Sequence, residues 1–373
     1  MMKISNERLE SLVAAIFARA GCRAPEDRQI ASRLVESNLV GHDSHGVIRV
    51  SSYIGWLREG KVLANQMIEI VLENEVIAVV DGKFGFGQAI GEQAVGHGIK
   101  KAAAHGVAVV AIRNCGHLGR IGDWAELAAA ADMLSLHFVN TSGLGNLVPP
   151  FGGIDRRLSA NPIAAGVPSP GRAPMILDIS TSSIAEGKIK VAFNKGIEVP
   201  PGCIIDFEGR PITDPKTFYG TPPGSILPFG GHKGYGLGVL AEVLAGALTG
   251  GGCTDPNVTR LSNGMLSIIL DPKFFTANPG HNAGFDTEVH RFVDWVKTSR
   301  KISPEGEILM PGELEQRTRT KRLAEGVELD DNTWKQILDT ARSVGLPEAT
   351  IASLTDIEAS HAHASVGMAP KPT

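Results

Sequence analysis

The chain reads Gly106-Val-Ala-Val-Val-Ala-Ile-Arg-Asn-Cys-Gly-His-Leu-Gly119 near its centre. Its apolar first half predicts a buried β-strand. The strand leads into a turn in which Gly116 and Gly119 flank His117. Histidine is the side chain best suited to proton transfer near neutral pH, and active sites of sheet proteins often lie beyond strand ends. A histidine that is only hydrogen-bonded in a turn is the equally open alternative.

Helices and further strands surround this strand. Ser5 can cap a first helix, and Pro25 is suited to the first turn of a second. Further helices are expected at 91–104, 123–131 and 234–248, and further strands at 69–72, 76–80, 134–139, 175–179 and 267–270. Residues 140–170, rich in Gly, Pro and Asn, predict a long irregular stretch.

This alternation predicts an α/β (α+β) chain. Residues 1–68 together with 285–355 have helical texture, and residues 69–284 form a sheet-rich domain. Residues 356–373 have the composition of a disordered tail.

A second candidate turn is Gly41-His-Asp-Ser-His-Gly46. A third helix is expected to start near Val47, so His45 and Arg49 would share one face at its N-terminal end. Such ends attract anions, and Arg49 could bind a carboxylate beside a proton-transferring His45. A solvated arginine and a capping histidine are the alternative.

A metal site finds little support. His42 and His45 resemble half of one, but no further ligand occurs at suitable spacing. The four cysteines form no C-x-x-C pair and are interpreted as free thiols in a reducing cytoplasm: Cys22, Cys115, Cys203 and Cys253. Cys115 is expected to be a buried or incidental thiol, and no metal is expected.

A third turn, Gly230-Gly-His-Lys-Gly234, places Lys233 at the start of an apolar helix. A cation there opposes the helix dipole, which makes more sense if an anion such as a phosphate lies between them. Asp178 and the hydroxyls of 180–183 follow another strand and suit ribose and phosphate contacts, although a plain polar turn is the strong alternative.

Composition excludes several classes of function. The chain has 43% hydrophobic and 20% charged residues and a net charge of −4, which gives no reason to expect nucleic acid or an anionic membrane. No apolar run is long enough to span a bilayer. Gly85-Phe-Gly87 begins like a Rossmann fingerprint, but Ile90 occupies the third glycine position, so another architecture is expected to hold any dinucleotide.

Taken together, the motifs resemble the malate/L-lactate dehydrogenase family of NAD(P)-dependent 2-oxo acid reductases, which is unrelated to the Rossmann lactate dehydrogenases. The resemblance covers about residues 5–355 and rests on segments that occur in family order: 41–46, 114–119, Asn161-Pro-Ile-Ala, Leu177-Asp-Ile-Ser-Thr-Ser182, 187–188, 200–202, 213–215, 231–236 and Pro311-Gly-Glu313.

The resemblance implies a non-Rossmann NAD(P)-binding sheet domain with helical flanks and a homodimer. It implies that His45 and His117 line the reaction centre, and that Arg49, with Ser44 and His45, binds a small 2-oxo or 2-hydroxy acid. It also implies a set of residues that contact NAD or NADP: Thr141, Asp178, Ile179, Ser180, Thr181, Ser182, Ser183, Ile184, His232, Lys233, Gly312 and Glu313.

Two departures from the family pattern affect fine contacts. Ser159-Ala160 stands where the family commonly has Gly-Thr, and Ile179-Ser180 where it has Met-Ala. The alternatives to a 2-hydroxy acid dehydrogenase are a reductase of cyclic 2-imino acids, a metal-dependent hydrolase or lyase using His42, His45 and His117, and a non-catalytic binding protein.

Overall fold

The computed structural model describes residues 2–143, 145–276 and 283–355. The chain divides into two compact units, one of residues 1–56 and 315–373 and the other of residues 57–314. None of the helices in these described ranges is long and apolar enough to cross a membrane. The expected tail, 356–373, lies outside the described residues.

The first unit is built mainly of helices. It contains β1 (Met2–Ile4), α1 (Asn6–Arg19), α2 (Glu26–Leu39), most of α3 (Val50–Arg58) and of α10 (Glu313–Glu325), β12 (Val327–Leu329), α11 (Asp331–Ser343) and α12 (Glu348–Thr355). The Ser5 side chain caps α1 by accepting from the backbone N–H of Arg8, as expected. Pro25 occupies the N-cap of α2, one residue before its expected place in the first turn.

The second unit contains a seven-stranded sheet of order β2-β3-β4-β11-β5-β6-β7. Its strands are β2 (Glu69–Glu73), β3 (Ile77–Asp81), β4 (Val107–Cys115), β5 (Leu134–Ser142), β6 (Ile163–Val167), β7 (Met175–Ile179) and β11 (Ser262–Leu270). Only β3 and β4 pair in parallel. This mixed sheet confirms the non-Rossmann expectation, because a doubly wound dinucleotide fold has a mostly parallel sheet.

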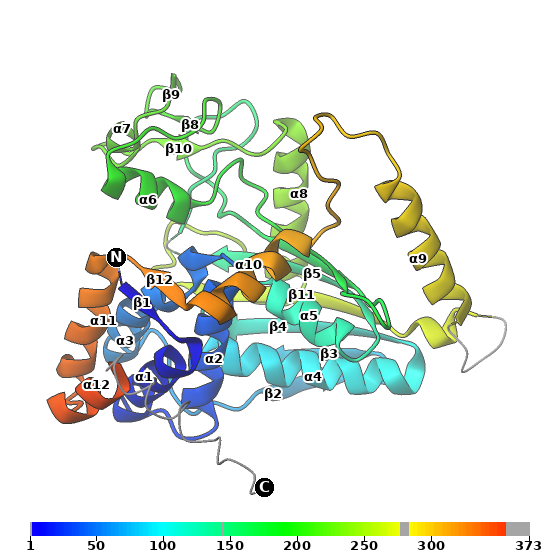
Figure 1. Ribbon diagram of the computed structural model, residues 1–373, viewed down its shortest axis with the longest axis horizontal. Coiled ribbons are helices and arrows are strands. Elements are labelled where there is room, and N and C mark those ends of the chain that lie inside the picture. The colour runs from blue at the N-terminus through cyan, green and yellow to red at the C-terminus, as the bar shows by residue number, and fades with distance from the viewer. Residues whose placement is uncertain (1, 144, 277–282, 356–373) are drawn as a thin grey trace, which may run out of the picture. The chain divides into compact units, whose positions relative to one another are not determined.

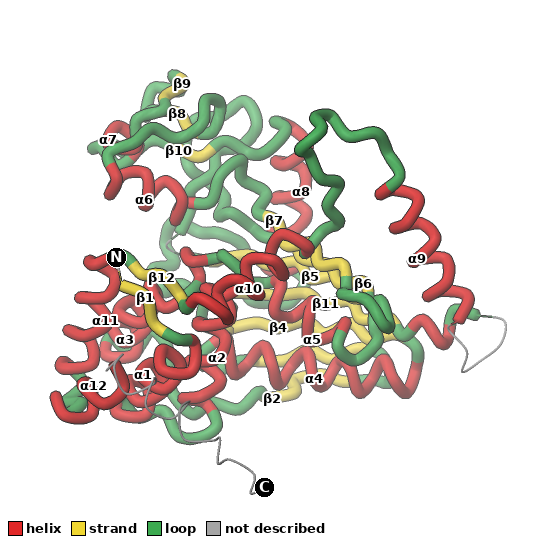
Figure 2. Tube along the Cα trace, in the orientation of Figure 1, coloured by secondary structure: helices red, strands yellow, loops and turns green. Residues whose placement is uncertain are grey.

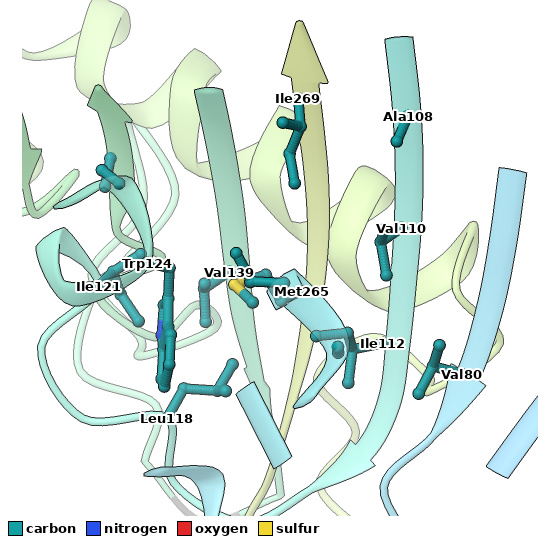
Figure 3. Packing of buried hydrophobic residues seen from close by; sticks show 14 of the residues in the cluster. Val80, Ala108, Val110, Ile112, Leu118, Ile121, Trp124, Val139, Met265 and Ile269 are labelled. Carbon is teal, nitrogen blue, oxygen red and sulfur yellow. The ribbon is translucent and has the colours of Figure 1, made fainter. Parts of the chain in front are cut away.

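Helices cover both faces of this sheet. On one face lie α4 (Gly87–His105) and α5 (Gly122–Ala129), whose apolar side chains form the main core with Val110, Ile112 and Ile269 (Figure 3). The opposite face carries α8 (His232–Glu242) and the π-helical turn Val243–Ala247, since Gly264 meets Ala245 and neighbouring residues of a strand point to opposite faces.

A small three-stranded sheet follows β7 in the same unit: β8 (Ile204–Ile205), β9 (Pro211–Ile212) and β10 (Ser225–Ile226) (Figure 2). Its short strands pack with α6 (Glu186–Lys195) and α7 (Pro215–Phe218) around a second apolar cluster that includes Ile189 and Phe218. The last helix of this unit, α9 (Ala283–Lys297), projects from the sheet in Figure 1.

Three features differ from the expectations. β6 lies within the stretch 140–170 that was expected to be irregular, because a short apolar run there pairs with both β5 and β7. The third helix begins at Val50 instead of near Val47. The unit boundaries fall at 56/57 and 314/315, so α9 belongs to the unit of the sheet, where Arg172 forms an ion pair with Asp294 and Ser169 hydrogen-bonds His290.

Candidate active site

In the first unit, Ser44, His45 and Arg49 occupy two short 3-10 turns, Asp43–His45 and Val47–Arg49. The expectation that His45 and Arg49 share one face at the N-terminal end of the third helix is therefore wrong, because that helix begins after both of them. The buried Asn38 side chain accepts from the Val47 N–H at 2.8 Å, and the Arg49 N–H donates to the Gly46 carbonyl. These bonds tighten the backbone before α3 begins.

The side chains of this segment are held by one another. The Ser44 hydroxyl lies 3.2 Å from His45 Nδ1, and Arg49 Nε donates to the Ser44 carbonyl at 2.6 Å. No other hydrogen bond fixes the Arg49 guanidinium within the described part of the chain, so its two terminal nitrogens can receive a carboxylate. Ser44 therefore contacts both His45 and Arg49, through its hydroxyl and its carbonyl respectively.

His42 faces a different set of charges. Its Nε2 lies 3.6 Å from Glu315 Oε1, while Asp43 binds Arg322 and the Asn38 amide. Nowhere in the described ranges do three or more His, Cys, Asp or Glu side chains gather as metal ligands would.

In the second unit, His117 follows the end of β4 in a turn fixed by backbone contacts. Gly116 N–H donates to the Gly85 carbonyl at 2.9 Å. Gly87 opens α4 directly against the turn, and a Cβ there would come within 2.2 Å of the His117 carbonyl oxygen. The glycines that resemble a Rossmann fingerprint thus brace the His117 turn. Cys115 is fully buried, which raises the pKa of its thiol, in agreement with the expected buried thiol.

Thr141, at the end of β5, is joined to the His117 turn by a side chain that the sequence did not single out. Asn263 on β11 accepts from the Leu118 N–H at 2.9 Å and donates to Thr141 Oγ1 at 2.9 Å. Asn140, the residue before Thr141, hydrogen-bonds Glu242 of α8. Glu242 had a sequence signal, since it is the one carboxylate in the apolar stretch 234–248, whereas Asn140 and Asn263 had none.

The segment 178–184 comprises the last two residues of β7 and the five that follow, and most of its polar groups have internal partners. Asp178 Oδ2 accepts from the Gly122 N–H at the start of α5, close to the buried Arg120. The hydroxyls of Thr181, Ser182 and Ser183 donate to the carbonyls of Ala160, Ile184 and Cys203, respectively. Ser180 Oγ lies 2.5 Å from Ser182 Oγ, and Ile179 pairs with Ile163 in the sheet.

This segment runs beside the N-terminus of α8. The Phe229 N–H donates to the Thr181 carbonyl at 3.1 Å, and Ser183 N–H donates to the Leu227 carbonyl. Gly230 and Gly231 have φ values of 56° and 64°, which favour glycine. His232 makes an edge contact with Phe151, and Lys233 is exposed. A hollow of about 340 Å³ lies here, lined by Pro150 to Gly153, Ser183, Gly202, Leu227, Pro228, Gly230 and Gly231.

Gly312 and Glu313 lie beside β7. The Ile176 N–H donates to the Pro311 carbonyl, and a Cβ on Gly312 would lie 3.1 Å from the nitrogen of Ile176. The Glu313 carboxylate forms an ion pair with Lys297 and accepts from the Met310 N–H.

The sheet register explains why these second-unit residues converge. Asn263 pairs with Cys115 and Thr141, and Ile163 pairs with Ile179. The last residues of β4, β5 and β7 and the first residues of β6 and β11 therefore lie at one end of the sheet. His117, Thr141 and the segment 178–184 all follow or occupy that end.

The fold matches that of a known class of enzyme. Over 92% of this chain and 98% of the other, the structure is similar to sulfolactate dehydrogenase from Methanocaldococcus jannaschii, with a TM-score of 0.82 and 36% identity. The sequence relatives of the chain define its class, which is that of dehydrogenases acting on 2-hydroxy acids.

The profile of the family described as malate/L-lactate dehydrogenase matches residues 4–338, and the chain belongs to that family. It is 41% identical to hydroxycarboxylate dehydrogenase B from Escherichia coli over 92% of this chain and 95% of that protein. It is also similar to a solved Δ1-piperideine-2-carboxylate reductase from Pseudomonas syringae, with a TM-score of 0.78 and 28% identity over 91% of this chain and all of the other.

A dehydrogenase of this family implies a nicotinamide cofactor, and the second unit has suitable groups for one. The exposed Lys233 stands at the N-terminus of α8, where backbone N–H groups attract anions. The adjoining glycines let a ligand approach the backbone closely. These features fit the phosphates of a dinucleotide.

Proposed function

We propose that the protein interconverts 2-oxo acids and 2-hydroxy acids with NAD or NADP, with Ser44, His45 and Arg49 binding the substrate. The carrying observation is the Arg49 guanidinium, which is anchored through Nε to the Ser44 carbonyl while its terminal nitrogens remain available. A planar guanidinium held in this way suits two parallel hydrogen bonds to the carboxylate of a 2-oxo acid.

The reaction needs one proton at the oxygen of the substrate. When bound, the nicotinamide supplies a hydride to the oxo carbon or accepts one from it. The oxygen then gains or loses a proton, and a histidine can exchange it near neutral pH. We assign this exchange to His117 or His45 and polarisation of the oxygen to the other, while Arg49 orients the carbonyl. The residues proposed to hold the cofactor are Thr141, 178–184, His232, Lys233, Gly312 and Glu313.

The first experiment follows NADH and NADPH absorbance with pyruvate, oxaloacetate, phenylpyruvate and hydroxyphenylpyruvate. Turnover of any of these fixes the substrate and cofactor together. His45→Gln and His117→Gln then separate the two roles, because the variant of the acid/base loses most of kcat while cofactor still binds. Near-full activity in both variants would contradict the assignment.

A reductase of cyclic 2-imino acids is the second candidate. It is favoured by the likeness to the Pseudomonas syringae piperideine-2-carboxylate reductase. Such a substrate carries the same carboxylate for Arg49, and its imine nitrogen takes the proton instead of an oxygen. Turnover of a cyclic imino acid without turnover of any 2-oxo acid would select this function.

Two further proposals concern the oligomeric state of the enzyme and its location in the cell. We propose a homodimer, supported by the family resemblance and by the exposed Phe292 and Trp295 of α9. We also propose the cytoplasm as its location, supported by four cysteines that are all free thiols.

A chelator control addresses the metal-dependent alternative, since the proposed dehydrogenase keeps its activity in the presence of EDTA.

A further inference from the structure

Asn263 is a buried polar residue whose side chain links two segments of the candidate site. It is 3% exposed and stands near the start of β11. Its Oδ1 accepts from the Leu118 N–H at 2.9 Å. Its Nδ2 donates to the Asn140 carbonyl at 3.0 Å and to Thr141 Oγ1 at 2.9 Å. Both amide hydrogens of Asn263 are therefore used.

A bulge in β4 explains why the Leu118 N–H needs this partner. Asn263 pairs with Cys115, but Met265 pairs with Ile112, so β4 contains one more residue than β11 over the same span. Asn114, within that span, has a φ of 50°. The bulge bends the end of β4 away from the regular ladder, as bulges beside active sites often do. Asn263 then supplies the acceptor that a strand would have supplied.

The contact with Thr141 fixes a direction of hydrogen bonding. An amide NH₂ only donates, so Thr141 Oγ1 accepts from Asn263 and must direct its own hydrogen elsewhere. Thr141 is thereby prepared to donate to an oxygen of a bound molecule. The same asparagine thus acts on the backbone of the His117 turn and on the polarity of the Thr141 hydroxyl.

A second layer of buried groups holds Asn263 in place. The Asn140 side chain accepts from the Gly264 N–H at 3.2 Å and donates to Glu242 Oε1 at 3.0 Å. Glu242 is 5% exposed and belongs to α8, the helix that begins at His232. Buried networks of satisfied polar groups restrict side chains to one arrangement. Asn140, whose carbonyl accepts from Asn263, is thereby fixed to a neighbouring helix.

We infer that Asn263 is a positioning residue of this enzyme, which holds the His117 turn through Leu118 and keeps Thr141 as a hydrogen-bond donor. This inference rests on the proposed function, in which His117 lines the reaction centre and Thr141 contacts the cofactor. Asn263 itself touches neither cofactor nor substrate in this account.

Two substitutions separate the two actions of Asn263. Asn263→Leu keeps the branched shape of the side chain and removes its bonds to Leu118, Asn140 and Thr141. Asn263→Asp keeps the acceptor for the Leu118 N–H, but its carboxylate can only accept, so the Thr141 hydroxyl turns inward to donate to it. Ser262→Ala is the matched control. It removes a buried hydrogen bond to Ser142 in the same pair of strands, and this bond does not involve the His117 turn.

Hydrogen exchange and cofactor binding provide the readouts, measured on the full chain. Asn263→Leu is expected to exchange faster in the peptide 115–121, and its kcat is expected to fall about 10- to 100-fold. Asn263→Asp is expected to keep the exchange protection while its Kd for NADH or NADPH rises about tenfold. Where His117 is the acid/base, a carboxylate near its turn also favours its protonated form, so the corresponding pH limb moves to higher pH. Ser262→Ala leaves exchange and pH profile unchanged.

Unaltered exchange in Asn263→Leu would overturn the inference, and so would faster exchange with wild-type kcat and Kd. A wild-type protein that turns over only imino acids would change the proposed substrate, but exchange and Kd would still test Asn263. A pH limb unchanged in Asn263→Asp, together with the expected exchange and Kd, would move the acid/base role away from His117 and leave the positioning role intact.

Discussion

At the scale of single residues, the candidate site depends on side chains whose hydrogen bonds leave them few other arrangements. Among the described residues, Arg49 has one anchoring bond, to the Ser44 carbonyl, and its remaining donors define the proposed carboxylate site. Asn263 has both amide hydrogens committed. His137, away from these residues on β5, is fully buried beside Ser267. Each of these residues leads to a distinct measurement.

Arg49→Lys is expected to raise KM for the 2-oxo acid about 10- to 100-fold, because a lysine cannot form the paired hydrogen bonds and one charge-assisted bond contributes about 1.5–3 kcal/mol. Cofactor Kd should stay near the wild-type value. Steady-state kinetics with varied oxo acid measure the effect, and Arg28→Lys at an exposed position of α2 is the control. An unchanged KM in Arg49→Lys would remove Arg49 from the carboxylate site.

His137 makes the stability of the protein depend on pH. Burial lowers the pKa of His137 to about 3, below about 6.5 in the unfolded chain. As pH falls below 6.5, the unfolded chain takes up a proton that the folded state refuses. The free energy of unfolding therefore decreases by up to about 1.4 kcal/mol per pH unit. Urea titrations between pH 7 and pH 4 measure this slope.

His137→Gln is expected to flatten that slope, since glutamine can keep a hydrogen bond to Ser267 and does not titrate. The same substitution at the exposed His105 distinguishes a specific effect from the general acid sensitivity of the protein. An equal slope in the wild type and in His137→Gln would mean that other groups cause the acid sensitivity.

At the scale of elements, the first turn of α4 supports the His117 turn. Gly87 brings the helix backbone against the His117 carbonyl, and a methyl group there would require one of the two elements to move. At another glycine of the same helix, Gly96, a Cβ would meet no atom within 4 Å apart from those of its chain neighbours and the adjacent helix backbone. Substitutions at these two glycines therefore distinguish the effect of packing against the site from the effect of helix propensity.

Gly87→Ala is expected to lower the free energy of unfolding by about 1–3 kcal/mol through overpacking, and to reduce kcat because the His117 turn shifts. Gly96→Ala is expected to stabilise by about 0.5–1 kcal/mol, since alanine is the better helix former, with kcat unchanged. Chemical denaturation and kinetics on both variants measure these effects. Equal behaviour of the two variants would contradict the close contact at Gly87.

At the scale of the whole molecule, α9 bears on the proposed dimer. It is tied to the sheet-containing unit by Arg172 and Ser169, yet Trp295 is 67% exposed and Phe292 is 46% exposed. Apolar side chains grouped on one helix often mark an interface between proteins. A second copy of this chain is the proposed partner.

Trp295→Asp is expected to weaken the dimer at least tenfold, because it places a charge where an aromatic side chain would be buried. Light scattering coupled to gel filtration, over a range of protein concentrations, measures the change. Val191→Asp is the control, at an apolar side chain of α6 that is also exposed. A wild-type protein that is monomeric at all concentrations would contradict the dimer proposal.

The sequence alone determined the family, the class of reaction and most elements of the second unit. These follow from local properties of the chain: apolar periodicity predicts β4 and β7, and short motifs carry His45, Arg49, His117 and Lys233. Such properties depend on neighbours within a few residues. They can therefore be recognised in the sequence without knowledge of the fold.

The tertiary structure alone decided what surrounds those motifs. Asn263 lies 145 residues from Leu118, and no local pattern connects them. β6 exists because β5 and β7 flank it, and Gly87 has its role because α4 meets the His117 carbonyl. Hydrogen bonds and close contacts of this kind join segments that are distant in the chain. Their partners are set by the register of the sheet, which the fold as a whole determines.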